Sequence, residues 1–124
     1  MTVEELLALA DAASERAYAP YSRFHVGCAV LTRDGGVVEG VNVENAVYPL
    51  GVCAERTAFA RAIAEGHRPG DFVTVAITAA PCGGCRQWLL EMGVELVVFR
   101  SGGRVLTMTP QELLPESFQA SDLP

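Results

Sequence analysis

The segment FVTVAITAAPCGGCRQWLLEMG, residues 72–93, contains an apolar run followed directly by a helical pattern. Residues 72–79 are almost continuously apolar, which is typical of a central strand that is buried on both faces of a sheet. Residues 82–92 predict a helix, and Gly93 supplies its C-terminal stop. Because a helix after a strand commonly returns the chain to a parallel neighbour, this segment predicts an α/β fold.

The residues before this segment predict a helix and a hairpin. Thr2 and Glu5 are spaced as a capping box, and apolar residues at helical spacing predict a helix that runs to about Tyr18. Residues 23–32 alternate as a strand, and the turn RDGG leads to a returning strand at residues 37–45. One face of the first strand is expected to hold Phe24, Val26, Cys28 and Val30.

The remaining elements complete a layered domain. Residues 53–65 predict a second helix, and residues 94–100 and 104–109 predict two further strands, the last at an edge of the sheet. Helices follow the second and third strands, so we expect the second and third, and the third and fourth, to pair in parallel. The prediction is one three-layer α/β/α domain over residues 1–124 with a mixed five-stranded sheet.

Composition limits the function classes. The chain has 124 residues, of which half are hydrophobic, and its formal net charge is −6. An acidic surface repels phosphate backbones, which argues against a nucleic-acid partner. The N-terminus lacks the basic start of a secretory signal, and no apolar run approaches the roughly 20 residues that span a bilayer. We therefore expect no membrane partner and a cytoplasmic location, where thiols stay reduced.

Three cysteines form a candidate metal site. Cys82 and Cys85 are one helical turn apart, and Cys53 begins the other predicted helix. Unpaired amide hydrogens and the helix dipole at such positions favour thiolate over thiol. Two helices that each follow a strand of one sheet can bring these sulfur atoms together at its edge. Three sulfur ligands indicate zinc, with a fourth position that stays open for water in a catalytic site.

Other readings of the cysteines remain open at this point. Cys28 lies in mid-strand among apolar residues, and it is either a small core residue or the fourth ligand of a structural zinc site. The Cys-x-x-Cys pair is also compatible with a redox function, and the three cysteines with unrelated buried positions. The combination of two cysteine motifs at two helix starts, one preceded by Pro81, favours the catalytic zinc site.

Glu55 is the candidate catalytic residue. It follows Cys53 too closely to be a comfortable co-ligand, but its side chain can reach a water at the open position and act as general base and then general acid. The alternative is an exposed glutamate at a helix start. Three thiolates leave the zinc cluster with a net negative charge, so we expect Arg56 to donate hydrogen bonds to them. The alternative is that Arg56 is an ordinary surface residue.

These motifs resemble those of a known family. Zinc deaminases carry a His/Cys-x-Glu motif followed by Pro-Cys-x-x-Cys, matched here by Cys53-Ala54-Glu55 and by Pro81 to Cys85. With YAPYSRFHVG, GVNVENAVYPLGVCAERTAF and ELLPESF, nearly the whole chain resembles the small homotetrameric cytidine deaminases of pyrimidine salvage. The resemblance implies that Cys53, Cys82 and Cys85 bind one zinc ion per subunit. It implies that Glu55 moves protons while cytidine or deoxycytidine is hydrolysed to uridine or deoxyuridine and ammonia.

The resemblance also implies substrate contacts. Asn42 and Glu44 would hold the ribose 3′-hydroxyl, and Phe24, for which core packing is an equal alternative, would line the base pocket. Phe118 would stack on the base from an adjoining subunit, and Tyr48 would close the ribose end across the same interface. The implied substrate-binding set is Phe24, Asn42, Val43, Glu44, Ala46, Tyr48, Ala54 and Phe118.

The chain departs from the family at one place. Only the residues TAAP, 78–81, connect the third strand to Cys82, where the family usually has a longer loop that shapes the rim of the base site and a subunit contact. A related deaminase of another aminated pyrimidine is therefore an alternative function. A non-catalytic zinc-stabilised interaction module is a second alternative, against which Glu55 and the count of three ligands argue. The acidic charge argues against polynucleotide editing.

Overall fold

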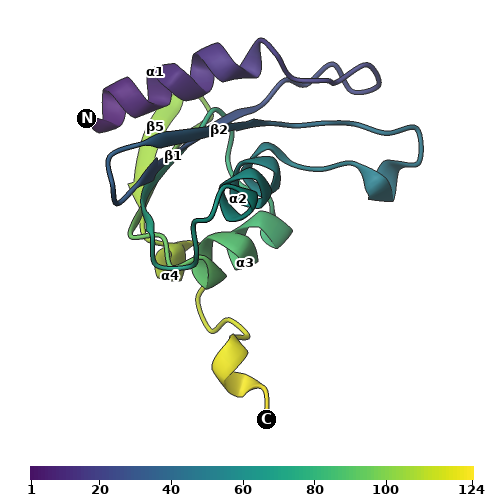
Figure 1. Ribbon diagram of the computed structural model, residues 1–124. Helices are drawn as coiled ribbons and strands as arrows, with labels where there is room; N and C mark the ends of the chain where they lie inside the picture. Colours follow the sequence, from purple (N-terminus) through teal and green to yellow (C-terminus); the bar gives the residue numbers. More distant parts are fainter.

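The computed structural model describes residues 1–124 and contains one mixed five-stranded sheet (Figure 1). The strands are β1 (Gly27–Thr32), β2 (Val37–Val41), β3 (Phe72–Ile77), β4 (Leu96–Ser101) and β5 (Arg104–Met108). Their order across the sheet is β2-β1-β3-β4-β5, so β3 is central and β5 is an edge strand, as the sequence predicts.

The pairing of the strands confirms one parallel contact and corrects another. β3 and β4 are parallel, as predicted, and β4 and β5 are antiparallel. The predicted pairing of the second and third strands is wrong, because β1 lies between them and is antiparallel to both. β2 and β3 therefore point the same way without touching, and the connection between them passes across β1.

Helices cover both faces of the sheet, which confirms the three-layer α/β/α architecture (Figure 1). On one face, α1 (Val3–Ser14) packs through Leu6, Leu7 and Ala10 onto Ala29, Ala76 and Val98. On the other face, a larger apolar cluster joins the sheet to α2 (Ala54–Ala64) and α3 (Gly83–Glu91). The short α4 (Pro110–Leu113) follows β5, and two 3-10 turns span Tyr48–Leu50 and Ala120–Asp122.

The first helix is shorter than the sequence predicts. Thr2 and Glu5 form the expected capping box, but the helix ends at Ser14 rather than near Tyr18. The amide of Tyr18 donates to the carbonyl of Asn42, and the carbonyl of Tyr18 accepts from the amide of Glu44. This pairing with a distant segment holds Tyr18 in an extended conformation. None of the helices is both long and apolar enough to span a bilayer.

The first strand also begins later than predicted, at Gly27 instead of residue 23. The side-chain amide of Asn42 binds the segment that precedes β1. Its oxygen accepts from the backbone amide of Val26 and its nitrogen donates to the carbonyl of Phe24, both at 2.8 Å. Apart from one backbone bond from the Asn42 amide to the Val26 carbonyl, side-chain hydrogen bonds thus replace strand pairing there. Val26, Cys28 and the next alternate residue, Val30, share the predicted buried face, whereas Phe24 is 61% exposed.

A close approach at Gly40 sets the position of α2. A Cβ atom at Gly40 would lie 2.4 Å from the carbonyl oxygen of Ala54 and 2.5 Å from the amide nitrogen of Ala58. Only glycine allows the backbone of α2 to pack this tightly on β2. Because α2 begins immediately after Cys53, this contact helps to fix the height of that residue above the sheet.

Candidate metal centre

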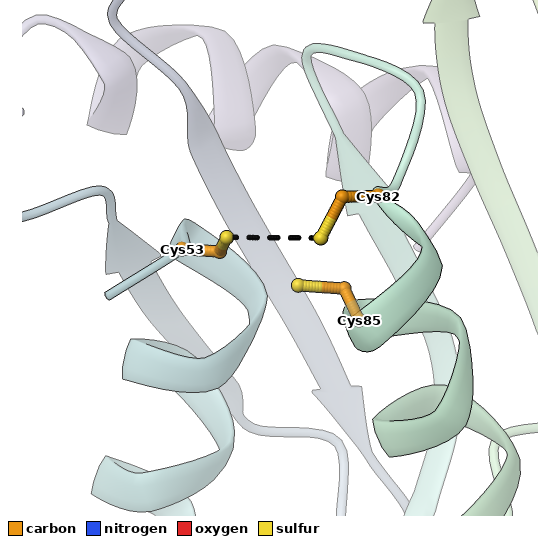
Figure 2. Close-up of side chains that lie close together, drawn as sticks. All are labelled: Cys53, Cys82 and Cys85. Atoms are coloured by element: carbon orange, nitrogen blue, oxygen red, sulfur yellow. Dashed lines mark hydrogen bonds between the residues drawn. The ribbon is translucent and has the colours of Figure 1, made fainter. Parts of the chain in front are cut away.

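Two neighbouring helix starts bring three cysteines together (Figure 2). Cys53 is the N-cap residue of α2, Cys82 is the N-cap residue of α3, and Cys85 lies in the first turn of α3. Figure 2 shows their sulfur atoms facing one another across the gap between the two helices. Cys85 is buried, Cys53 is half-buried and Cys82 is exposed, so the cluster has one side open to ligands.

The spacing of the sulfur atoms fits zinc. The three Sγ atoms all lie within 4.8 Å of one another, and those of Cys53 and Cys82 are 3.9 Å apart. Two sulfur atoms bound to one tetrahedral zinc ion at about 2.3 Å are expected to be about 3.8 Å apart. Cys28 is not part of the cluster and packs in the core, where burial raises the pKa of its thiol. The cluster thus offers three protein ligands and not four.

The surroundings of Cys53 favour its metal-binding thiolate form. The pKa of Cys53 is lowered to about 6, mainly by hydrogen bonding from Cys85 and less by Cys82 and the charge of Arg56, against the opposing effect of burial. The same interaction raises the pKa of Cys85, because its thiol is the donor. Both helix starts add a favourable dipole. A divalent cation among these sulfur atoms would replace the shared proton.

Glu55 is buried next to this cluster. Its side chain is only 3% exposed although it lies in the first turn of α2, so the alternative of an exposed helix-start glutamate is wrong. Burial raises the pKa of Glu55 to about 7, and the negative charge of Cys53 contributes in the same direction. A carboxyl group with such a pKa takes up and releases protons near neutral pH, as a general acid–base residue must.

A cavity of about 270 Å³ lies at the cluster. Cys53, Cys82 and Glu55 form one part of its wall, and Ala54 lies beside them. The remaining wall consists of Ser22, Phe24, Val26, Asn42, Glu44, Ala79 and Ala80. Of the predicted substrate-binding residues, the structure therefore brings Phe24, Asn42, Glu44 and Ala54 to the candidate metal site.

Asn42 and Glu44 hold the rim of this cavity. Glu44 accepts hydrogen bonds from the amides of Tyr21 and Ser22 at 2.9 and 3.0 Å, and another from the Ser22 hydroxyl. These bonds lower the pKa of Glu44, and those from Ser22 contribute most. A carboxylate has about four acceptor positions, and the Asn42 amide two donors and two acceptors. Both side chains therefore keep capacity for a ligand hydroxyl.

Other predicted residues lie outside the cavity. Val43 pairs with Tyr18 and Val52 and is 40% exposed. Ala46 lies on an exposed loop, Tyr48 begins the 3-10 turn that follows it, and Phe118 lies on the C-terminal tail, which extends away from the body of the molecule (Figure 1). Arg56 is exposed and its side chain makes no hydrogen bond to a protein atom, so its predicted bonds to the thiolates are not formed in this arrangement.

Sequence reasoning missed several residues that support the site. Ser22 fixes Glu44, and Thr78 accepts from the amide of Gly27. Arg86 donates from Nε to the carbonyl of Pro81 and from Nη1 to that of Leu113, each at 3.0 Å. Gln87 donates to the carbonyl of Phe118 at 2.9 Å. Arg86 and Gln87 directly follow Cys85, which is the signal that could have drawn attention to them.

Comparisons with known proteins agree with this geometry. Residues 1–101 match the family described as the cytidine and deoxycytidylate deaminase zinc-binding region. A cytidine deaminase of Halalkalibacterium halodurans is 42% identical over 132 aligned positions, which cover 99% of this chain and 98% of that protein. A cytidine deaminase of Mycobacterium tuberculosis is 39% identical, with 93% of this chain and 88% of that protein covered.

A crystal structure gives the same result. The cytidine deaminase of Burkholderia pseudomallei superposes with a TM-score of 0.88 and 46% identity, covering 95% of this chain and all of that one. Three cysteine thiols at tetrahedral spacing match the zinc-binding character of the family, and zinc is the metal of this site. The chain belongs to the cytidine and deoxycytidylate deaminase family.

Proposed function

We propose that the protein is a zinc-dependent hydrolase of pyrimidine salvage that converts cytidine and deoxycytidine into uridine and deoxyuridine with release of ammonia. The observation that carries this proposal is the buried Glu55, which lines the same cavity as the thiols of Cys53 and Cys82. A structural zinc site has no use for a protonatable carboxyl group beside an open ligand position. We further propose that residues 1–124 act as one catalytic domain.

The roles of the residues follow from their chemistry. Zinc held by Cys53, Cys82 and Cys85 would act as a Lewis acid and lower the pKa of a water molecule toward about 7. Glu55 takes a proton from the attacking water and delivers it to ring nitrogen 3, while the oxygen bonds to carbon 4. Glu55 then takes the remaining proton of the added hydroxyl group and passes it to the amino group. The carbon–nitrogen bond breaks, ammonia leaves and a carbonyl group remains at carbon 4. A pKa of about 7 for Glu55 suits both transfers.

The sugar would be held by Asn42 and Glu44. Both side chains are fixed by backbone hydrogen bonds, so they are preorganised for a ligand. Their remaining acceptors and donors suit a sugar hydroxyl, which both donates and accepts. Phe24 and Ala54, which line the same cavity, would contact the base. Arg56 would turn toward the thiolates once the metal is bound.

Exposed apolar residues support the proposal of a homotetramer with active sites at subunit interfaces. Tyr48 is 73% exposed, Leu50 is 66% exposed and Phe118 is 60% exposed. Tyr48 and Leu50 share one 3-10 turn, and large apolar side chains exposed together commonly mark a protein interface. Val43, Ala46 and Tyr48 would close the sugar end of a neighbouring site, and Phe118 would stack on a neighbour's substrate. A cytoplasmic location is proposed because metal-binding thiolates need a reducing compartment.

An ultraviolet assay of the purified protein tests the function. Cytidine, deoxycytidine, cytosine and deoxycytidine monophosphate are the substrates, and bound zinc is quantified in the same preparation. We expect turnover of the two nucleosides. Glu55→Gln should keep zinc and lower turnover by about a hundredfold or more, because general acid–base catalysis is removed. Unchanged turnover in Glu55→Gln, or full activity without metal, would contradict the proposal. Turnover of another aminated pyrimidine alone would favour the related deaminase.

A further inference from the structure

A second cavity, of about 440 Å³, adjoins the catalytic cavity. The two cavities share Phe24, Ala79 and Ala80 as a common wall. The second cavity continues from Thr78 to the turn between β4 and β5, at residues 100–104. Because residues 78–81 alone connect β3 to the Cys82 cap of α3, this connection adds only the small side chains of Ala79 and Ala80 to the common wall, beside Phe24.

The wall of this second cavity, here called the arginine cavity, is rich in hydrogen-bond donors. Arg100, Arg104 and the hydroxyls of Thr78 and Ser101 line it, and none of its lining residues is acidic. Arg100 forms an ion pair of 2.7 Å with Asp11, which does not line the cavity. Arg104 forms no ion pair. An acid-free cavity with a free guanidinium, in a chain of net charge −6, matches an anionic group.

The proposed reaction orients the substrate relative to this cavity. The reacting carbon 4 of the pyrimidine has two ring neighbours, nitrogen 3 and carbon 5. Nitrogen 3 must face Glu55 to receive its proton, so carbon 5 points to another part of the wall. Ala79 and Ala80 are the lining residues that lead into Cys82, beside which carbon 4 must lie. Their small side chains leave room for a substituent to pass into the arginine cavity.

We infer that the arginine cavity binds an anionic substituent, such as a carboxylate, carried by carbon 5 of the pyrimidine, and that Arg104 is its principal partner. This inference rests on the proposed function, which supplies the orientation of the ring. A planar guanidinium pairs with a carboxylate through two parallel hydrogen bonds, so the site selects by charge and shape. An anion on the sugar fits less well, because the Glu44 carboxylate lies in the sugar-binding part of the catalytic cavity and repels it.

Steady-state kinetics on four substrates test the inference. The substrates are cytidine, 5-methylcytidine, 5-carboxycytidine and cytidine 5′-monophosphate, and calorimetry gives the dissociation constant of 5-carboxyuridine. We expect Arg104→Gln, whose amide can replace at most one of the two hydrogen bonds, to lower kcat/KM for 5-carboxycytidine and to weaken binding of 5-carboxyuridine by about tenfold or more. Ser101→Asp, which adds a carboxylate to the cavity and leaves Arg104 in place, should act in the same direction. Arg61→Gln removes an equal charge at a helix surface and serves as the control.

Several results would overturn the inference. Equal losses for cytidine and 5-methylcytidine would make Arg104 a structural residue. A loss confined to cytidine 5′-monophosphate would place the anion on the sugar. Arg104→Gln without any effect would leave the arginine cavity without a function in binding. Absence of cytidine turnover in the unmodified protein would refute the proposed function, while the calorimetry with 5-carboxyuridine would still decide whether Arg104 binds the anion.

Discussion

Gln87 Nε2 donates a 2.9 Å hydrogen bond to the backbone carbonyl of Phe118, so the helix that carries two metal ligands also holds the aromatic residue of the C-terminal tail. Gln87 lies half a turn beyond Cys85 on α3, and no other side-chain hydrogen bond binds the backbone of Phe118. The position of the tail therefore depends on the same helix as the metal site.

Removal of this donor should affect substrate binding and not the metal. Gln87→Glu keeps the shape of the side chain but sets a carboxylate against the Phe118 carbonyl. Because one hydrogen bond contributes about 1 kcal/mol, we expect KM to rise roughly fivefold with zinc content unchanged. Gln111→Glu, on α4 and without a side-chain hydrogen bond, is the matched control. An unchanged KM in Gln87→Glu, or a rise equalled by the control, would show that the bond does not position Phe118 for the substrate.

Arg86 should determine how tightly zinc is held. It binds the carbonyl of Pro81, which precedes Cys82, and the carbonyl of Leu113 at the end of α4. Residues that orient metal ligands commonly change metal affinity by about 10–100-fold when replaced. We expect Arg86→Gln to lower zinc affinity by about tenfold, measured by competition with a chromophoric chelator. Arg61→Gln should leave the affinity unchanged, and equal affinities in both variants would refute this role for Arg86.

Removal of zinc should destabilise the fold. Without the ion, three thiols at two helix starts lose the group that holds them together, and Cys53 gains only the hydrogen bonds from Cys85 and Cys82. Because a ligand that binds only the folded state raises its stability, the apoprotein should have a lower Tm. Calorimetry before and after chelation measures the change. Zinc should restore the original Tm and magnesium should not, since thiolates bind the softer ion. Recovery with magnesium would contradict a sulfur site.

Gly40→Ala should displace the helix that carries Cys53 and Glu55. The new Cβ would lie 2.4 Å from the carbonyl oxygen of Ala54, and a backbone atom cannot move aside like a flexible side chain. We expect a loss of about 1–3 kcal/mol in the free energy of unfolding together with weaker zinc binding. Gly83→Ala is the control, because its Cβ would meet no atom within 4 Å. Similar urea unfolding of the two variants would contradict the close approach at Gly40.

Ser22 and Glu44 should contribute a pH-dependent stability. Hydrogen bonds from Ser22 lower the pKa of Glu44 from its ordinary 4.5. Because the pKa of Glu44 is lower in the folded than in the unfolded state, its ionised form stabilises the folded protein at pH values above the unfolded-state pKa. This contribution is lost as the pH falls through the folded-state pKa. The difference in unfolding free energy between the unmodified protein and Ser22→Ala should therefore be constant near pH 7 and shrink as the pH falls below 4.5. Ser14→Ala removes a bond to a neutral carbonyl and should give a constant difference. A constant difference for Ser22→Ala would exclude the linkage.

The sequence predicted the features that are local. Cys53 and Glu55 are two residues apart at one helix start, and Cys82 and Cys85 share one turn of another, so their spacing already indicates the cluster. The capping box at Thr2 is equally local. The burial of Glu55 was not predictable in this way, because it depends on packing between α2 and the sheet.

The features that the sequence did not predict depend on distant partners. The helix ends before Tyr18 because that residue pairs with Val43, and the first strand begins at Gly27 because the Asn42 side chain holds the segment before it. The position of β1 between β2 and β3 is likewise set by tertiary packing. The side chains of Arg86 and Gln87 donate to backbone carbonyl groups. Because every residue has such a group, the sequence does not indicate which carbonyl will be the partner. The roles of Ala46, Tyr48 and Phe118 remain predictions.

The separation of the metal ligands along the chain has a consequence for biosynthesis. Cys53 lies before α2 and β3, and Cys82 and Cys85 follow them, so the three sulfur atoms reach the observed arrangement only when α2 and α3 have packed beside the central strand. The complete set of three ligands is therefore available only after the chain as far as Cys85 has left the ribosome. An ion bound earlier by Cys82 and Cys85 alone would have only two protein ligands until Cys53 reached its position beside them.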